Sequence, residues 1–251
     1  MQTLPPADHR PWRLPSRPWW GEQTWHSLTF LHWPVSAKIL KPLIPPRLEL
    51  EEYDGTAWVA VTPFWMSGVT MRGIPPVPLL SRFPELNTRT YVTRDGMPGV
   101  WFFSLDAGSF LAVLAARRLF HLPYFYARMH HRTENGRIFY RSERVGGPGF
   151  DAWYAPRGEA SQSRPGSLEH WLTERYCLYA KDRGGQLYRA EIHHAPWALQ
   201  AAALEIARNE LLTGQGIPVT GPPALAHFAN RLDVAIWSPE PVGSGESGVK
   251  R

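Results

Sequence analysis

The sequence has little cysteine, and Cys177 is its one thiol. A single cysteine excludes a disulfide within the chain and a zinc site built from a cysteine cluster, and it favours a reducing compartment. Long hydrophobic runs are also missing, because no stretch approaches the roughly 18 apolar residues that cross a membrane. Prolines break the N-terminal segment from Met1 to Trp20 before a signal-peptide core can form. We therefore expect a cytoplasmic protein with no membrane partner.

Lysine is scarce as well, with four residues at Lys38, Lys41, Lys181 and Lys250. An amine that forms an imine with a carbonyl compound must lose its proton near neutral pH, which requires burial or a neighbouring cation. The predicted positions of these lysines are a short helix, the edge of a hairpin turn and the C-terminal tail. The sequence therefore predicts no lysine in the role of a Schiff-base amine.

Apolar residues are plentiful by contrast, at 43% of 251 residues, which suffices for a buried core. The 25 prolines and 21 glycines favour turns and strands over long helices, and the 12 tryptophans suit the walls of an apolar pocket. We predict an α+β fold of mostly antiparallel strands with two or three helices. The expected organisation is a proline-rich lead over residues 1–23, one domain over 24–242 and a flexible tail over 243–251.

Local patterns place the elements. Alternating apolar residues predict a strand over Thr24–Trp33, and four hairpins are expected around glycine-containing turns at Asp54–Gly55, Asp95–Gly96, Glu134–Gly136 and Asp182–Gly185. Helices are predicted from Ser36 to Leu43, over Gly108–Leu119, after Ser167 and over Trp197–Leu212. The segment Pro156–Pro165 is interpreted as a polar loop.

Neither the charge nor the histidines predict binding of a nucleic acid or a metal. The net charge is +5, from 27 basic and 22 acidic residues, but its arginines are spread over a helix and a hairpin rather than gathered in a basic run. The adjacent pairs His130–His131 and His193–His194 sit on predicted strands, where neighbouring side chains point to opposite faces and cannot chelate one ion. We expect no nucleic-acid partner, no metal and no cofactor.

One predicted hairpin carries a polar cluster. If Lys181 pairs with Gln186 across its turn, one face holds several groups used in proton transfer, namely Glu174, Tyr176, Arg189, Glu191 and His193. Buried, such a network would line a site or stiffen the core. Exposed, it would be a charged sheet surface, and the sequence leaves both interpretations open.

A series of segments, taken together, resembles the YqjF-like family of uncharacterised bacterial proteins from about Trp25 to Val242. These segments are Lys41–Pro45, Thr62–Phe64, Phe83–Val92, Pro98–Ala107, Glu174–Tyr179 and Tyr188–His194. That family looks related to the acetoacetate decarboxylase-like superfamily, through Ser104–Ala107, the helix after it and Phe120–Phe125. The resemblance implies a β-barrel around a small, partly apolar cavity for oxo acids.

The resemblance also shows a departure. In the decarboxylases the corresponding helix leads into a Phe-Pro-Lys-Lys stretch that holds the Schiff-base lysine, and here those lysine positions fall on Tyr124 and Phe125. The decarboxylase mechanism cannot be carried over without that amine. An acidic residue of the superfamily's site aligns near Asn87 or Glu85.

The expected function is binding of a small carboxylate or carbonyl compound. The candidates for catalysis are Tyr124, Glu191 and His193, and those for substrate binding are Asn87, Arg89, Tyr91 and Trp101. Arg89 could hold a carboxylate bidentately, or pair on a sheet surface instead. Tyr124 could donate to an oxyanion, or pack beside Pro123. An enzyme without an imine, a non-catalytic binder or sensor on the same scaffold, and a homo-oligomer of either all remain open.

Overall fold

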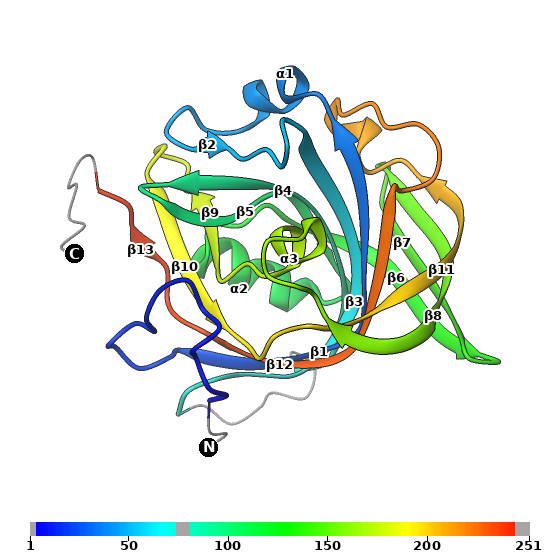
Figure 1. Cartoon of the computed structure of the whole chain (residues 1–251), viewed down its shortest axis with the longest axis horizontal. Helices are drawn as coiled ribbons and strands as arrows, with labels where there is room; N and C mark the ends of the chain where they lie inside the picture. Colours follow the sequence, from blue (N-terminus) through cyan, green and yellow to red (C-terminus); the bar gives the residue numbers. More distant parts are fainter. Residues whose placement is uncertain (1–3, 74–80, 244–251) are drawn as a thin grey trace.

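The computed structural model describes residues 4–73 and 81–243. Their strands form one mostly antiparallel sheet, drawn in Figure 1. In chain order the strands are β1 (Gly21–Val35), β2 (Glu49–Leu50), β3 (Ala57–Met71), β4 (Phe83–Arg94), β5 (Met97–Ala107), β6 (Tyr124–Glu134), β7 (Arg137–Arg144), β8 (Gly149–Gln162), β9 (Cys177–Lys181), β10 (Leu187–His193), β11 (Ala198–Asn209), β12 (Leu225–Ile236) and β13 (Glu240–Pro241). The α-helices are α1 (Ala37–Leu40), α2 (Phe110–Leu119) and α3 (Leu168–Thr173).

The pairing of the strands closes the sheet on itself. Starting at β1, the chain of neighbours runs through β3, β4, β5, β9, β10 and β12 and returns to β1, so seven strands form a closed ring. The remaining long strands β6, β7, β8 and β11 extend from β5 round to β12. The pairs β5–β6 and β5–β9 are parallel, and the other pairings are antiparallel. The predicted class, mostly antiparallel sheet with a few helices, is confirmed.

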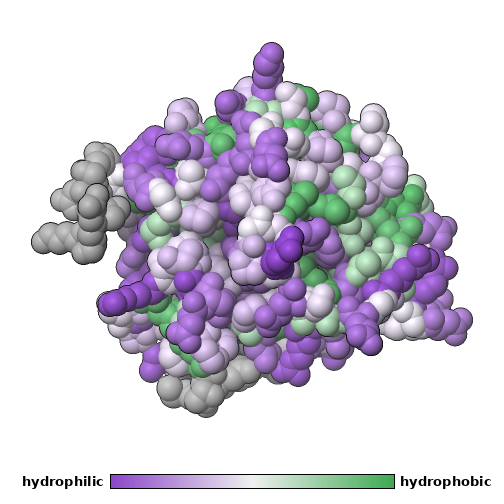
Figure 2. Space-filling view, in the orientation of Figure 1, coloured by the Kyte–Doolittle hydropathy of each residue, from purple (hydrophilic) through white to green (hydrophobic). Residues whose placement is uncertain are grey.

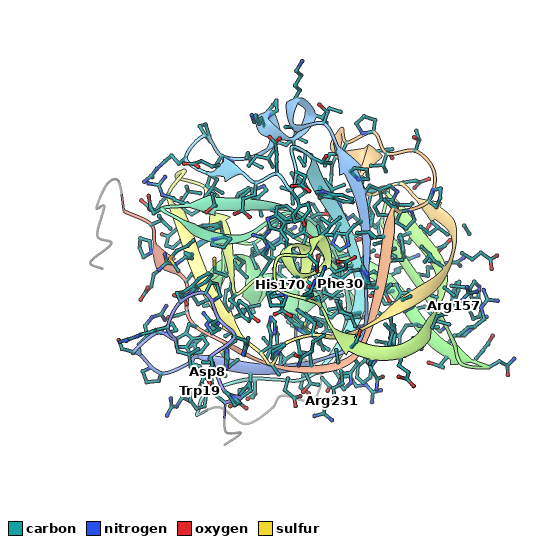
Figure 3. The ribbon with its side chains drawn as sticks, in the orientation of Figure 1. Asp8, Trp19, Phe30, Arg157, His170 and Arg231 are labelled. Atoms are coloured by element: carbon teal, nitrogen blue, oxygen red, sulfur yellow. The ribbon has the colours of Figure 1, made fainter. Side chains whose placement is uncertain are left out.

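Alternation along the strands decides what faces inward. In β4 the odd-numbered side chains Phe83 and Glu85 are buried on the inner face, as expected for a strand whose successive side chains point to opposite faces. Figure 3 shows the result, with Phe30 of β1 in the middle of the molecule and Arg157 and Arg231 projecting at its edge. The ring therefore encloses side chains from every strand that builds it.

Two of the expected helices lie against this ring. Helix α2 begins after Ser109, whose side chain accepts a hydrogen bond from the backbone NH of Ala112 at 3.3 Å, and α3 is capped in the same way by Ser167. Such side-chain caps satisfy amide groups that the first helical turn leaves without partners. Both helices are confirmed. Within the described ranges, no helix has the length and apolar character needed to cross a bilayer.

Three of the four hairpin turns are also confirmed: β4 and β5 flank Asp95–Gly96, β6 and β7 flank Asn135–Gly136, and β9 and β10 flank Asp182–Gly185. Asp95 and Asn135 have positive φ angles, as the turn requires. The fourth prediction was a long hairpin around Asp54–Gly55. Only a single bridge, between Tyr53 and Thr56, forms there in the described structure. The long hairpin is wrong, because β2 pairs with β4 and not with β3.

Two further predictions are wrong. The segment expected as a helix over Trp197–Leu212 is strand β11, and β8 continues to Gln162 through most of the segment expected as a polar loop. Both errors have one cause, because β8 and β11 pair with each other over their whole length, and long-range pairing overrides the helical preference of alanine, leucine and glutamate.

Figure 2 shows hydrophobic residues gathered on the side of the molecule where Figure 1 draws β7 and β11.

The start of β1 and the register of the β9–β10 pair also differ from expectation. Strand β1 begins at Gly21, three residues before the predicted start, and most of the expected tail lies outside the described residues. Lys181 pairs with Leu187 rather than with Gln186, so Glu191 lies opposite Cys177. A slip of one residue moves side chains to the other face of a strand pair. The face that carries Arg189, Glu191 and His193 therefore also carries Cys177 and Tyr179.

The parallel contact between β5 and β9 depends on Gly99. A β-carbon at this position would lie 2.7 Å from Cys177 Sγ and 2.8 Å from the Cys177 carbonyl oxygen. We expect Gly99→Ala to lower the free energy of unfolding by about 1–3 kcal/mol, because two strands would have to move apart. Gly214→Ala is the control, since its β-carbon would meet Pro148 at an ordinary 3.5 Å. Urea unfolding measures both, and equal midpoints for the two variants would contradict the tight approach of β5 and β9.

Candidate functional site

A cavity of about 250 Å³ lies inside the ring, and each of the seven ring strands contributes to its wall. Side chains of α2, the end of α3, the start of β6 and the connecting segments also line it. Most of the wall is apolar, including Trp25, Phe64, Met66 and Trp197. A concave, largely apolar space with a few polar groups is typical of a small-molecule site.

Strand β4 supplies the polar groups of this wall. Glu85, Asn87 and Arg89 all line the cavity, because residues two apart on a strand share a face and lie about 7 Å apart. Thr62 of the neighbouring strand β3 pairs with Asn87 and lines the cavity beside it. The sequence pattern of β4 thus places an acid, an amide and a guanidinium in one row.

Glu85 is the buried acid of the cavity, with 4% of its surface exposed. Its Oε2 accepts a hydrogen bond from the hydroxyl of Tyr124 at 2.6 Å. Burial raises the pKa of Glu85 from 4.5 to about 7, although hydrogen bonds from Tyr124 and Asn87 favour the ionised form. The pKa of Tyr124 lies well above 10 because the phenol is buried beside this carboxylate. Near neutral pH, Glu85 can therefore accept or donate a proton, and Tyr124 stays protonated.

The backbone around Glu85 is held in place by a second phenol. The hydroxyl of Tyr140, which is buried, lies 2.6 Å from the carbonyl oxygen of Glu85 and 2.8 Å from that of Phe64. Tyr140 belongs to β7, so its hydroxyl links β7 to the backbones of β3 and β4. This contact fixes the position from which the Glu85 side chain enters the cavity.

Two arginines bring positive charge to the cavity wall. Arg89 Nε has no hydrogen-bond partner among the described residues, and its guanidinium lies 5.1 Å from the ring centroid of Phe30. Arg175 forms an ion pair with Glu51 and donates from Nε to the Trp171 carbonyl oxygen at 2.7 Å, while its Nη2 has no partner there. Arginine stays charged even though burial lowers the pKa of Arg89. Unpaired buried donors are costly, and an anion would satisfy them.

Tyr91 supports Arg89 from below the cavity surface. It is fully buried, and its hydroxyl lies 2.7 Å from Nε2 of His32, which is buried too. Burial and the nearby Arg89 hold the pKa of His32 well below 6.5, so the imidazole is neutral. Tyr91 is therefore close to the site without lining it.

The structure brings together some of the residues predicted from the sequence and separates others. Asn87, Arg89 and Tyr124 line the cavity. Trp101 is not part of its lining and packs instead with the cluster around Cys177 and Tyr179. Glu191 and His193 are also absent from the lining. Three of the seven predicted site residues therefore line the cavity, and four do not.

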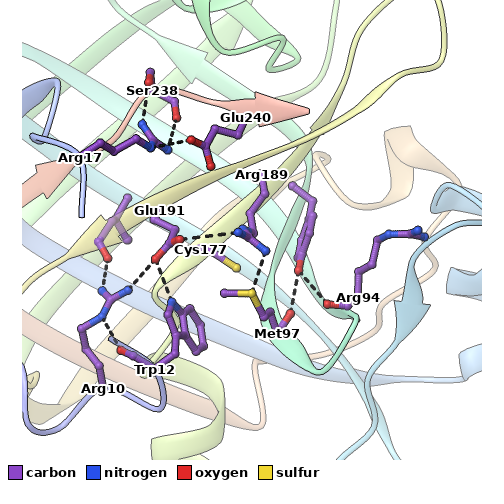
Figure 4. A network of polar contacts seen from close by, with 12 residues as sticks. Arg10, Trp12, Arg17, Arg94, Met97, Cys177, Arg189, Glu191, Ser238 and Glu240 are labelled. Atoms are coloured by element: carbon purple, nitrogen blue, oxygen red, sulfur yellow. Dashed lines mark hydrogen bonds and ion pairs between the residues drawn. The ribbon is translucent and has the colours of Figure 1, made fainter. Parts of the chain in front are cut away.

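Glu191 and His193 contact the N-terminal lead and not the cavity. Glu191 Oε2 accepts hydrogen bonds from Arg10 at 3.0 Å and Trp12 at 2.8 Å, as Figure 4 shows. His193 Nε2 lies 2.9 Å from the carbonyl oxygen of Pro5. The expected five-residue network is divided in two. Glu174 accepts hydrogen bonds from the Tyr176 hydroxyl and the backbone NH of Trp197, whereas Arg189 pairs with Glu191 at 3.8 Å. Glu191 and His193 anchor the lead to β10.

Sequence reasoning missed Arg175 and Thr62, and it named Glu85 only as one of two positions for an aligned acid. The alternation of Glu85, Asn87 and Arg89 within Phe83–Val92 was a usable signal for the acid. Arg175 follows a short helix outside any strand pattern, so its approach to the cavity depends on the closed ring.

The chemistry open to the cavity follows from these groups. Burial raises the pKa of the Cys177 thiol to about 12 and lowers that of His194 to about 3, so the first is no thiolate nucleophile and the second is neutral. Lys38, Lys41 and Lys181 are exposed outside the cavity, and Lys250 lies outside the described residues. No group of three or more potential ligands for a metal ion occurs in the described part of the chain. The wall is equipped to bind an anion and to move a proton.

Comparison with known proteins gives the same architecture. The chain is 44% identical to the uncharacterized protein YqjF of Bacillus subtilis (strain 168) over 226 residues, 89% of this chain and 93% of that protein. It resembles the crystal structure of acetoacetate decarboxylase from Legionella pneumophila with a TM-score of 0.63 and 14% identity, covering 97% of this chain and 98% of the other. It also resembles the enduracididine biosynthesis enzyme MppR complexed with pyruvate, with a TM-score of 0.65 and 11% identity over 92% of each chain.

These likenesses confirm the resemblance found in the sequence. At such low identity the solved structures establish the fold alone, an acetoacetate decarboxylase-like ring of strands. The family model of DUF2071, described as an uncharacterized conserved protein, matches residues 22–233, which is most of the chain. The chain therefore belongs to the DUF2071 family.

Proposed function

We propose that the cavity binds a small oxo carboxylate and that Glu85 transfers a proton to and from the ligand carbon next to the ligand's carbonyl group. The reaction forms no covalent imine. The observation that carries this proposal is the placement of Arg89 and Arg175 around the same cavity as Glu85, each with a nitrogen that no described residue satisfies. Charged donors of this kind recognise carboxylates. A carboxyl group whose pKa lies near the working pH is suited to general acid–base catalysis.

The proposed step conserves atoms and electrons. Ionised Glu85 takes a proton from the carbon next to the carbonyl, and the electron pair of the broken C–H bond forms a carbon–carbon double bond. The carbonyl oxygen becomes an oxyanion, which the guanidinium of Arg89 stabilises. Protonated Glu85 then returns a proton to carbon or exchanges it with water. Tyr124, which donates to Glu85 in the free protein, holds the carboxylate in place.

Proton exchange in heavy water tests this proposal. Each member of a panel of 2-oxo and 3-oxo acids is incubated with the protein in D₂O, and proton NMR follows the loss of the signal beside the carbonyl. Faster exchange with protein than with buffer supports the proposal, and borohydride is expected to trap no adduct. Binding without faster exchange would favour the second candidate, a non-catalytic binder or sensor, which the mostly apolar wall also suits. Failure of every acid to bind would contradict both.

Arg89 gives the proposal its sharpest binding test. Arg89→Gln should raise the dissociation constant of a bound oxo acid about 10- to 100-fold, because a charge-assisted hydrogen bond to the carboxylate is lost. Isothermal titration calorimetry measures the constant. Arg231→Gln, which changes an exposed arginine outside the cavity, is the matched control and should bind as the wild type does. Equal affinities for the two variants would remove Arg89 from the proposed site.

A further inference from the structure

The cavity has a charged end and an apolar end. The charged groups of its interior, Glu85, Arg89 and Arg175, come from β4 and from the segment after α3. Glu22 is the other acid in the lining, and its Oε1 accepts a hydrogen bond from Trp19 at 2.9 Å. The part of the wall that α2 contributes contains alanine, leucine and no charged residue. If a ligand bound at the arginines extends to α2, the part of it that contacts the helix should therefore be apolar.

The face of α2 that lines the cavity carries mostly small side chains. Its lining residues are Ala112, Ala115, Ala116 and Leu119, which are spaced i, i+3, i+4 and i+7 and so form one stripe along the helix. At 1.5 Å per residue the stripe covers about 10 Å. Three of its four side chains are single methyl groups, so the space beside the helix stays open to a ligand chain.

Aromatic rings meet at the edge of this apolar end. Trp20, from the N-terminal lead, and Phe120, just after α2, both line the cavity, and their ring centroids are 5.3 Å apart. Both rings are partly exposed. Gly21 and Met71, at the adjoining ends of β1 and β3, pair with each other and line the same edge. The apolar end thus reaches the surface beneath an aromatic edge, where Glu22 and Thr70, the next pair along β1 and β3, also line the opening.

We propose that the natural ligand is a carboxylate with an unbranched apolar chain, whose head lies at Arg89 and Arg175 and whose chain runs along the alanine stripe of α2. This inference rests on the carboxylate site of the proposed function and adds the substrate class. Arg175 supports the carboxylate site independently of the stripe, because it lines the cavity, its side chain is 6% exposed, and its Nη2 has no partner among the described residues.

Binding of a series of saturated carboxylates tests the chain. Butanoate, hexanoate, octanoate and decanoate are titrated against the full-length protein by calorimetry, below their micellar concentrations. The dissociation constant should fall about fourfold for each added methylene group that enters the apolar end, since each buried methylene contributes a similar increment. The gain should stop when the chain reaches the aromatic edge.

Two variants locate the chain. Ala116→Leu fills the stripe and should weaken decanoate binding by at least about tenfold while leaving butanoate unchanged. Arg118→Leu adds the same side chain on the exposed side of the same helix, outside the cavity lining, and should bind the whole series as the wild type does. Arg89→Gln should weaken every member by a similar factor.

The outcomes separate this inference from the proposed function. If butanoate binds through Arg89 and longer chains bring no gain, the chain-bearing ligand is wrong and the carboxylate site stands. A gain that Ala116→Leu leaves intact would place the chain elsewhere and overturn the inference. If no carboxylate of any length binds, the carboxylate site of the proposed function is overturned together with it.

Discussion

Glu85→Gln is expected to slow the exchange of the proton beside the carbonyl by at least about a hundredfold, while the dissociation constant of the oxo acid changes by no more than about threefold. The amide keeps the size of the carboxyl group and can still accept the hydrogen bond from Tyr124, but it cannot take up a proton. Removal of a positioned general base typically costs a factor of 10² to 10⁴ in rate. Proton NMR in D₂O measures the exchange, and calorimetry measures the binding.

Glu191→Gln is the discriminating companion, because Glu191 is the acid that sequence reasoning selected. Its carboxylate is held by Arg10 and Trp12 outside the cavity, so the variant should exchange the proton at the wild-type rate once its folding has been verified by circular dichroism. The reverse pattern, with exchange lost in Glu191→Gln and kept in Glu85→Gln, would transfer the role to Glu191 and contradict the cavity site.

The second large effect is on stability and has a defined pH window. The pKa of Glu85 is about 7 in the folded protein against 4.5 for the ordinary carboxyl group, so between these values the folded state binds the proton more tightly than the unfolded state does. The stability that this group contributes is fully present below pH 4.5 and is lost as the pH rises through 7. The loss between pH 5 and pH 8 should amount to about 2–3 kcal/mol.

Comparison with Glu85→Gln isolates this contribution. Urea unfolding of the two proteins at pH 5, 6, 7 and 8 gives the difference in their free energies of unfolding, in which the titration of the histidines cancels. Relative to the wild type, the variant should gain about 2–3 kcal/mol from the lowest to the highest pH. Parallel curves would mean that Glu85 titrates normally in the folded protein.

The sequence predicted those elements whose signals are local. Helix α2 was found because Ser109 caps an apolar periodicity, and the turns at Asp95 and Asn135 were found because their sequences favour positive φ angles. Strand β11 was not found, because its residues individually prefer a helix and only pairing with β8 makes them a strand. Local preference carries no information about that partner.

The candidate site divides along the same line. Asn87 and Arg89 were named because they lie in a segment that resembles the YqjF-like family, and Tyr124 because its segment resembles the decarboxylase-like proteins. Glu191 and His193 lie outside the cavity lining, where the N-terminal lead contacts them. The contact between Pro5 and His193 joins residues 188 positions apart, which no pattern within a hairpin can reveal.

The most direct test is a carbon-13 NMR titration of the carboxyl group of Glu85 in the wild-type protein, assigned by its loss in Glu85→Gln. We predict a midpoint near pH 7 in the free protein. Tyr124→Phe should raise the midpoint further, since the lost hydrogen bond favours the ionised form. A midpoint near 4.5, unchanged in Tyr124→Phe, would contradict a buried proton-transfer group in this cavity.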